Sequence, residues 1–546
     1  MSPSDSTPDP YLPRQQVPLL LTSVFIIAIC GILYELLIST ISSYFQGSSV
    51  LHFSLVIGLF LSFMGVGSYL SRFIERDLLT WFIRFEIWLS IIGGASAVIL
   101  YFAFSLTPYF YGVAFLLIGA LGSLIGVEIP ILTRIVRRRE SLRDAMAKVL
   151  SFDYLGSLIA SVAFPLILLP TLGTMRTAFV IGLLNLAVAA LNAWTFRADL
   201  SAPRRLFALC AVVALLLTAG FGYSFQLVRF FDQFLYQDQI LYTQQSAYQH
   251  LVMTRWNDDL RLFIDGNIQF SSLDEYRYHE PLVHVPMLLA QRHGQVLILG
   301  GGDGLAAREV LRHAGVDSVI LVDLDPAMTR LGRTHPALVR LNDSALHDPR
   351  VRIVNQDAFQ FVAESRASYD VVLIDLPDPN HPSLGKLYSQ SFYRLVQRRL
   401  GAGGMVITQS TSPYFAPEAF WCIHHTLASV WPGTTLPMTV YVPSFGQWGF
   451  NLARQGPATR RAAPLSAEAG PVMPLPEASL IAQASAQLQA ELMAQPWADT
   501  LRFLNPGIIS TLFAFDEDMQ PRPTVINRLD DQKLLQYYEE SWDAWR

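Results

Sequence analysis

The sequence predicts a bundle of about seven membrane-spanning α-helices, followed by a small antiparallel β module and a doubly wound α/β domain. Charged residues make up only 15% of the 546-residue chain and hydrophobic residues 52%, and the apolar excess lies almost entirely before Gly222. From about Tyr236 the composition becomes that of a soluble α/β protein. There, a short apolar run leads directly into a cluster of glycines, as in the first strand and turn of nucleotide-binding sheets.

The first half contains apolar stretches that are long enough to cross ~30 Å of hydrocarbon as helices. Buried helices of a large soluble protein would show polar faces at helical spacing, and segments such as Leu55 to Leu61 show none. The first stretch is also too long for the apolar region of a signal peptide, and further spans follow it. The predicted spans are 17–45, 50–74, 79–104, 109–135, 149–170, 176–196 and 205–222.

Basic residues predict how these spans are oriented, because cytoplasmic loops are enriched in Lys and Arg. The loop after the fourth span is strongly basic between Arg134 and Lys148, whereas the loop at 105–108 has no basic residue. This places the N-terminus inside, and seven full crossings would then leave the α/β domain outside. We expect that one segment, with the short last one as the best candidate, does not cross, so that the α/β domain of this multi-pass inner-membrane protein faces the cytoplasm.

Three carboxylates lie inside or at the edge of the apolar spans, namely Glu35, Glu128 and Asp153. Intramembrane acids are costly, so they are candidates for function. The alternative is that they form hydrogen bonds between helices or lie near the interface, as Glu128 would beside Arg134. A transport role for the bundle stays open on this basis.

Overall charge and cysteine content exclude several classes of protein. The formal net charge is -5, and a nucleic-acid partner would leave a strong basic excess. The three cysteines, Cys30, Cys210 and Cys422, are far apart in the chain. We therefore expect no nucleic-acid partner, no disulfide framework and no metal site.

The soluble half begins with a predicted antiparallel module. Gln239 to Tyr242, His250 to Thr254 and Arg261 to Ile264 have the composition of strands, and Asp265-Gly266-Asn267 that of a turn.

The strand predicted at Gln295 to Leu299 runs into the turn Gly300-Gly301-Gly302-Asp303-Gly304, and a helical pattern follows. Glycines in such a turn let the backbone approach a ligand closely. A second strand, Val319 to Val322, ends at Asp323, about twenty residues after the glycines, where a carboxylate can accept hydrogen bonds from both ribose hydroxyls.

Two further predicted strands also end in acids. Val351 to Val354 leads to Asp357, and Tyr369 to Ile374 leads to Asp375 and Asp378. A single such acid is commonly a helix cap or a solvated loop residue, but the carboxyl ends of successive parallel strands form the ligand site of open α/β sheets. Because no lysine of a phosphate-binding loop follows the glycines, the pattern favours a nucleoside with a positive tail over a polyphosphate.

These motifs resemble the polyamine aminopropyltransferases, spermidine synthases above all. The resemblance covers roughly 242–450, and the family includes bacterial members with several membrane spans before this domain. It depends on the glycine turn at 300–304, the acids Asp323 and Asp357, the DxxDP motif at 375–379 and the segment DEYRYHE at 274–280.

The resemblance implies that decarboxylated S-adenosylmethionine is a co-substrate and that no other cofactor is needed. It also implies a diamine acceptor, putrescine by default, and a homo-oligomer. Asp375 matches the catalytic aspartate of the family. The residues implied to bind the donor or methylthioadenosine are Gln249, Gly300, Gly302, Asp323, Asp357, Ala358 and Pro382. Those implied to bind the polyamine or aminopropyl chain are His279, Asp303, Asp378 and Gln269.

Two of these assignments have a physical reason. Asp303 would attract the aminopropyl ammonium and repel the carboxylate of intact S-adenosylmethionine. Asp375 can take the proton of the attacking amine as a general base. The chain departs from the family where Asp357-Ala358 replaces Asp-Gly, and where an Ile-Pro-Thr-Tyr stretch of the acceptor site is replaced by residues 441–450. The identity of the acceptor therefore stays open.

Two other functions remain as alternatives. One is a membrane-anchored methyltransferase that uses S-adenosylmethionine, because the Rossmann-like sheet of methyltransferases is shared with the family. The other is a non-catalytic polyamine sensor or transporter. The expected organisation is a polar N-terminal segment at 1–16, a transmembrane domain at 17–222, a β module at 236–292, a nucleoside-binding domain at 293–454, a linker at 455–477 and a helical tail at 478–546.

Overall fold

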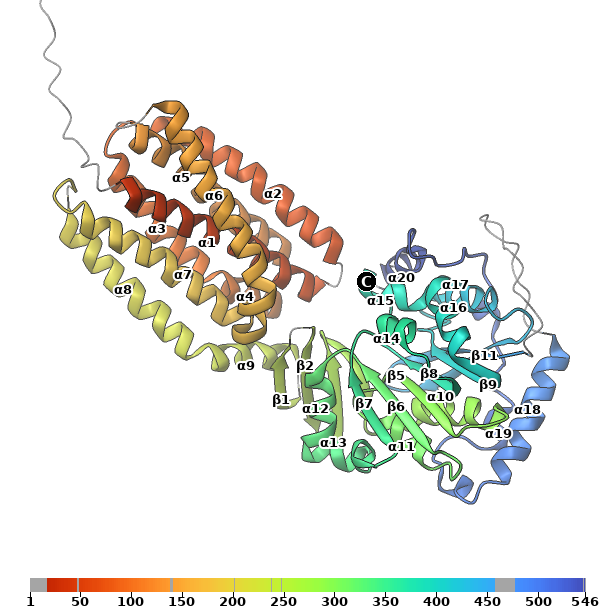
Figure 1. The fold of residues 1–546 in the computed structure, drawn as a ribbon. Coiled ribbons are helices and arrows are strands. Elements are labelled where there is room, and N and C mark those ends of the chain that lie inside the picture. The colour runs from red at the N-terminus through yellow and green to blue at the C-terminus, as the bar shows by residue number, and fades with distance from the viewer. Residues whose placement is uncertain are drawn as a thin grey trace, which may run out of the picture. The chain divides into compact units, whose positions relative to one another are not determined.

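The computed structural model forms two compact units, Met1–Ile240 and Leu241–Arg546 (Figure 1). It describes residues 17–46, 49–137, 141–200, 202–236, 238–246, 248–456, 477–543 and 545. The predicted polar segment at 1–16 and most of the predicted linker at 455–477 lie outside the described residues.

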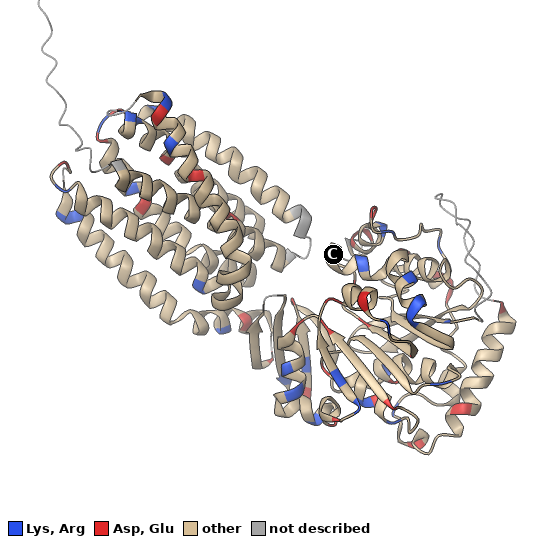
Figure 2. Ribbon diagram, in the orientation of Figure 1, with Lys and Arg blue, Asp and Glu red and all other residues tan. Residues whose placement is uncertain are grey.

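The first unit is helical, as predicted. Within the described residues, six helices are long and apolar enough to cross a membrane, and Figure 2 shows that Lys, Arg, Asp and Glu are sparse along them. The α-helices of this unit, some of which join into one of the six long helices, are α1 (Val17–Gln46), α2 (Ser49–Leu70), α3 (Leu78–Gly94), α4 (Ser96–Leu106), α5 (Phe110–Arg137), α6 (Leu142–Ala163), α7 (Leu169–Thr195), α8 (Pro203–Gly222) and α9 (Ser224–Leu235).

The six helices overlap all seven predicted spans, because one of them extends from Leu142 to Thr195 and covers most of two. Its backbone is not helical at Gly173, where φ is 69° and ψ is 179°. Such a positive φ suits glycine. On either side of this break α6 and α7 both pack against α1, so the chain passes through the helical unit twice here.

Two buried carboxylates lie in the long apolar helices α3 and α5. Glu128 is 1% exposed and Glu86 is 0% exposed, and the two carboxyl groups interact electrostatically with each other. Sequence reasoning placed Glu128 beside Arg134, but the Arg134 guanidinium instead donates to the carbonyl oxygens of Ser71 and Ile74. Glu86 was not among the predicted intramembrane acids.

The second unit begins with a four-stranded antiparallel sheet whose strands follow the chain order. The predicted turn is present, with a φ of 48° at Asp265 and 80° at Gly266. It joins the third strand to a fourth that the sequence did not predict. The strands are β1 (Gln239–Gln245), β2 (His250–Trp256), β3 (Asp259–Ile264) and β4 (Asn267–Ser271).

A seven-stranded sheet forms the centre of this unit, in the order β10-β11-β9-β8-β5-β6-β7. Neighbours from β9 to β7 are parallel, as predicted for β5 to β8, whereas β11 is antiparallel to both β9 and β10. The strands are β5 (Gln295–Gly300), β6 (Ser318–Asp323), β7 (Val351–Asn355), β8 (Tyr369–Asp375), β9 (Leu400–Gln409), β10 (Thr435–Val442) and β11 (Gly446–Arg454).

Alternating side chains of β5 enter different parts of the core. Val296 and Ile298 belong to one apolar cluster, and Leu297 and Leu299 belong to another. Successive side chains of a strand point to opposite faces, so a parallel strand covered on both sides is apolar throughout. This explains why the strand appears in the sequence as a continuous apolar run.

Helices that follow or precede the strands cover the sheet (Figure 1). Those that position the site are α10 (Tyr276–Leu289), α11 (Leu305–Leu311), α12 (Pro326–Thr334), α14 (Ala358–Glu364), α15 (Pro382–Gly385), α16 (Gln390–Arg399) and α17 (Pro417–Ala428).

The C-terminal segment packs against the same unit. It contains α18 (Ala478–Met493), α19 (Pro506–Ile509) and α20 (Lys533–Asp543). Leu488 and Ile509 are fully buried in one core cluster, and Leu534 is fully buried in the other. The tail is therefore part of the folded α/β unit.

Candidate functional site

The glycine turn brings the end of β5 against the end of β8. Gly300, Gly301 and Gly304 have φ values of 89°, 64° and 86°, which side chains other than glycine rarely adopt. A Cβ atom on Gly300 would lie 1.9 Å from the carbonyl oxygen of Asp375, and the N–H of Gly301 donates to this oxygen at 3.2 Å. The turn therefore fixes the glycine backbone beside Asp375.

Asp323, at the end of β6, faces the same turn. Its Oδ2 accepts from the Gly302 N–H at 3.1 Å, and its Oδ1 accepts from the Asp325 N–H at 2.8 Å. Burial raises the pKa of Asp323 to about 7, although both backbone hydrogen bonds oppose the shift. The carboxylate is thus held within reach of any ligand that lies over the glycines.

The predicted Gln249 is tied to Asp323 through two other residues. The Gln249 N–H donates to Ser246 Oγ, and the Ser246 hydroxyl donates to Asp325 Oδ2 at 2.7 Å. Since Asp325 in turn donates to Asp323, the loop before β2 is fastened to the end of β6. The antiparallel sheet thereby contributes Gln249 to the region of the site.

Asp357 caps a helix and also forms an ion pair. Its Oδ1 accepts from the N–H groups of Phe359 and Gln360 at the start of α14, where Ala358 is the first helical residue. Its Oδ2 lies 2.6 Å from Lys386 Nζ. Pro382 begins the short helix α15 just before Lys386, so Asp357 and Pro382 lie in neighbouring segments. The helix-cap interpretation of Asp357 is correct, and it does not exclude the predicted contact with an adenine.

Asp375 ends β8 and accepts a hydrogen bond from the Tyr278 hydroxyl at 2.7 Å. Burial raises its pKa above the usual value, although His279 and the hydrogen bond from Tyr278 oppose this shift. A carboxyl group with a raised pKa is a stronger base than an exposed one. Tyr278 was not singled out in the sequence.

His279 and Asp303 lie beside Asp375. His279 Nδ1 forms a hydrogen bond with Glu275 Oε2 at 2.9 Å. Burial alone would lower the pKa of His279, but Glu275, Asp303 and Asp375 raise it to about 9. Burial raises the pKa of Asp303 to about 6, and Asp375 adds to the shift while His279 opposes it. These groups form one electrostatic cluster.

Asp378 is held by three neutral donors. Tyr538 Oη donates to Oδ2 at 2.9 Å, Gln409 Nε2 to Oδ1 at 3.3 Å and Thr411 Oγ1 to Oδ2 at 3.5 Å. Burial raises the pKa of Asp378 to about 6 despite these hydrogen bonds. Tyr538 comes from α20, far along the chain, and sequence reasoning did not assign it to the site.

Gln269 lies apart from the strand ends in its described contacts. Its side-chain amide donates to the Asn267 carbonyl at 3.2 Å, within its own hairpin. The structure thus places Asp303, Asp375 and His279 together, links Asp323 and Gln249 to the same turn, and leaves Gln269 on the antiparallel sheet.

The segment that replaces the acceptor-site stretch of the resembled family forms the β10–β11 hairpin. Tyr441 is 55% exposed. Ser444 instead bonds the Asp274 carboxylate through its N–H at 2.7 Å and its hydroxyl at 2.9 Å, and Phe445 packs edge-on against the ring of Tyr278. The hairpin therefore touches the DEYRYHE segment through Ser444 and Phe445.

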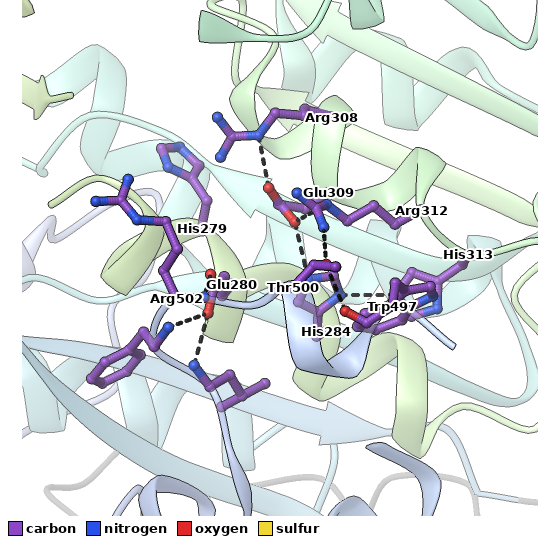
Figure 3. A network of polar contacts seen from close by, with 12 residues as sticks. His279, Glu280, His284, Arg308, Glu309, Arg312, His313, Trp497, Thr500 and Arg502 are labelled. Atoms are coloured by element: carbon purple, nitrogen blue, oxygen red, sulfur yellow. Dashed lines mark hydrogen bonds and ion pairs between the residues drawn. The ribbon is translucent and has the colours of Figure 1, made fainter. Parts of the chain in front are cut away.

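A second layer of charge surrounds the cluster (Figure 3). Arg308 bonds both Glu275 and Glu309, and Glu309 also contacts Arg312 at 2.9 Å and His284 at 3.1 Å. These partners outweigh burial and lower the pKa of Glu309 to about 2. Arg308 thus anchors the Glu275 that holds His279.

Glu280, in the same segment of α10, binds the C-terminal region instead. Its carboxylate accepts from the backbone N–H groups of Arg502, Phe503 and Leu504 (Figure 3). Residues 274–280 were predicted as a motif, but the sequence could not show that Glu275 and Glu280 have different partners, because those partners are distant in the chain.

The arrangement is suited to a ligand that carries a nucleoside and positive charge. Asp303, Asp323, Asp375 and Asp378 are each only partly exposed, and all four have raised pKa values. A cation placed among them would favour their ionised forms. Among the residues that the structure describes, no group of three or more His, Cys, Asp or Glu side chains could hold a metal ion.

Comparison with known proteins supports this description. A sequence model described as "Spermine/spermidine synthase domain" matches residues 275–461. The chain is 43% identical to a polyamine aminopropyltransferase of Leptospira interrogans, over 95% of this chain and 98% of that protein. It is also 43% identical to polyamine aminopropyltransferase 1 of Ralstonia nicotianae, over 98% of this chain and 97% of that one. A crystal structure of spermidine synthase from Thermotoga maritima aligns with 55% of this chain and 88% of its own, with a TM-score of 0.43 and 22% identity.

Replacing Gly302 by alanine is expected to weaken nucleoside binding. The new Cβ would lie 2.4 Å from Asp323 Oδ2, so the carboxylate would have to leave its hydrogen bond with the Gly302 N–H. Loss of a hydrogen bond to a charged group corresponds to about a tenfold or greater loss of affinity. Calorimetric titration with methylthioadenosine measures the effect. Gly456→Ala, where no atom lies within 4 Å of the added Cβ, is the control, and equal affinities in the two variants would contradict the placement of Asp323.

Proposed function

Because the chain belongs to the polyamine aminopropyltransferase family, we propose that it transfers the aminopropyl group of decarboxylated S-adenosylmethionine to putrescine, with Asp375 as the general base. Aminopropyl transfer itself follows from the family, which uses this donor and an amine acceptor. The observation that carries the finer proposal is the group of desolvated carboxyls at the ends of neighbouring strands. The alternatives of a methyltransferase or a non-catalytic sensor are set aside by membership of the family.

The reaction requires a neutral amine, since an ammonium has no free electron pair. The amine nitrogen forms a bond to the carbon beside the sulfonium, the carbon–sulfur bond breaks, and methylthioadenosine leaves with that electron pair. Asp375 accepts the proton from the attacking nitrogen. Its raised pKa makes it a better proton acceptor near neutral pH, and Tyr278 fixes the orientation of its carboxylate.

The donor would lie over the glycine turn. In this proposal Asp323 binds the ribose hydroxyls, Asp357 and Ala358 contact the adenine, and Gln249 and Pro382 complete the nucleoside pocket. Gly300 and Gly302 leave space for the ligand because they carry no side chain. The contacts that hold Asp323 against Gly302 support this arrangement.

The amine-binding part of the site would use Asp303, Asp378 and His279, with Gln269 as a further predicted contact. Asp303 neutralises the aminopropyl ammonium of the donor, and Asp378 binds the far ammonium of the acceptor. Intact S-adenosylmethionine carries a carboxylate that Asp303 would repel.

The full chain, purified in detergent, is expected to form methylthioadenosine and spermidine from decarboxylated S-adenosylmethionine and putrescine. Asp375→Asn should lower kcat by about 10²–10⁴-fold while methylthioadenosine binding is retained, because the amide cannot accept the proton. Asp530→Asn changes an exposed carboxylate and serves as the control. Wild-type rates in Asp375→Asn would refute its role as base. Transfer from intact S-adenosylmethionine, or no product with any amine, would refute the proposed reaction.

Acceptor binding is expected to weaken in acid. Burial raises the pKa of Asp378, the proposed acceptor-binding acid, to about 6, so this carboxyl is protonated below that pH and ionises as the pH rises through it. A cationic amine binds the ionised form. Below pH about 6 the affinity for putrescine should therefore fall toward a limit of about tenfold per pH unit, as titration calorimetry can measure. Constant affinity between pH 5 and 7 would show that Asp378 does not bind the amine.

We propose that the catalytic unit faces the cytoplasm, where a cytosolic nucleoside donor is supplied. The basic residues after α5 support an inside position for that loop. The catalytic unit then lies on the same side if α8, the last and shortest of the predicted spans, does not cross the membrane. A fluorescent protein fused to the C-terminus is expected to fluoresce, and alkaline phosphatase at the same position to remain inactive. The opposite pair of results would place the catalytic unit outside.

A further inference from the structure

The C-terminal helix α20 supplies a residue to the proposed acceptor site. Tyr538 Oη donates to Asp378 Oδ2 at 2.9 Å, although the two residues are 160 positions apart in the chain. This is the shortest of the three hydrogen bonds that the described residues donate to Asp378. The contact therefore links the end of the chain to the acid that follows β8.

The segment before α20 is firmly anchored. Asn527 is fully buried, its side-chain amide donates to the Gly385 carbonyl at 3.0 Å, and its own carbonyl accepts from the Gln390 N–H at 2.9 Å. Its Oδ1 then accepts from the N–H of Leu534, which is also fully buried. These bonds attach the start of α20 to the segment after α15, next to the proposed nucleoside site.

The other end of α20 is held on the loop between β9 and α17. The rings of Trp542 and Phe415 stack with centroids 5.7 Å apart, and Trp545 Nε1 donates to the Phe415 carbonyl at 3.1 Å. The same loop contains Thr411, whose hydroxyl also reaches Asp378. Both ends of α20 are thus attached to the α/β unit, so the position of Tyr538 beside Asp378 is set by the packing of the helix.

The surroundings of Asp378 suit a ligand cation. Its donors Tyr538, Gln409 and Thr411 are all neutral, and among the described residues the phenols of Tyr278 and Tyr388 are the other titratable groups that interact with it. Hydrogen bonds from neutral donors favour the ionised carboxyl without cancelling its charge. The charge remains available to an ammonium group.

We propose that Tyr538 is a positioning residue of the acceptor site, which holds the Asp378 carboxylate in the orientation that receives the far ammonium of a diamine. The inference rests on the proposed function and extends it to the C-terminal helix. Tyr538 acts through Asp378, so it affects acceptor binding more than donor binding or the rate of the chemical step.

The test compares Tyr538→Phe with Tyr537→Phe. Both changes remove one hydroxyl from the same helix, but the Tyr537 hydroxyl accepts from the Val525 N–H and has no described contact with Asp378. Tyr538→Phe is expected to raise KM for putrescine by about tenfold, as for loss of a hydrogen bond to a charged group, and to leave kcat and KM for the donor close to the wild-type values. Tyr537→Phe should change none of these.

The pH dependence gives a readout that a purely structural role would not move. Of the hydrogen bonds that oppose the raised pKa of Asp378, the one from Tyr538 has the largest effect. Without it the carboxyl ionises at higher pH, so the acid limb of putrescine affinity should shift to higher pH in Tyr538→Phe alone. Equal KM values and equal pH profiles in the two variants would overturn the inference.

Direct binding separates this inference from the proposed function. Putrescine is titrated calorimetrically into the full chain saturated with methylthioadenosine, whose own affinity reports that each variant is folded. If the wild type binds putrescine but does not turn it over, the proposed reaction fails, and the loss of affinity in Tyr538→Phe still decides the role of Tyr538. If the wild type does not bind putrescine at all, both are wrong.

Discussion

The close approach of the glycine turn to the end of β8 determines the rest of the site. The absence of a side chain at Gly300 lets the turn pass against the Asp375 carbonyl, where a Cβ atom could not fit. This contact sets the register of the strand ends, since Gly300 is paired with Asp375 across β5 and β8. Asp303, which leaves the same turn, and Asp323, which bonds it, are consequently brought to the edge of the sheet where Asp375 lies.

A site built in this way has an electrostatic cost that a cationic ligand relieves. Desolvation raises the pKa values of several neighbouring carboxyls, and like charges raise them further. In the structure the positive charge of His279 opposes these shifts at Asp303 and Asp375, and Glu275 and Arg308 hold His279 in place. An ammonium group of the substrate supplies the same kind of compensation, so ligand binding and ionisation of the carboxyls support each other.

The C-terminal segment has a larger part than its place in the sequence suggests. Its helices fill both apolar clusters of the α/β unit through residues such as Leu488 and Leu534, and residues 502–504 satisfy the Glu280 carboxylate. The stability of the sheet and the arrangement of the acceptor site therefore depend on the same segment. The proposed role of Tyr538 follows from this packing.

The sequence by itself determined the apolar spans, the strands β1 to β3 and β5 to β8, the glycine turn and the acids that follow the strands, because each of these depends on a local pattern of apolar, glycine and acidic residues. It did not reveal β4, the antiparallel placement of β11, the pairing of Glu86 with Glu128, or the hydroxyls of Tyr278 and Tyr538 on Asp375 and Asp378. These features join residues that are distant in the chain, and no local pattern records which distant side chain will meet a given carboxylate. Only the tertiary structure decided them, since the packing of α10 and α20 against the sheet brings those hydroxyls to the strand ends.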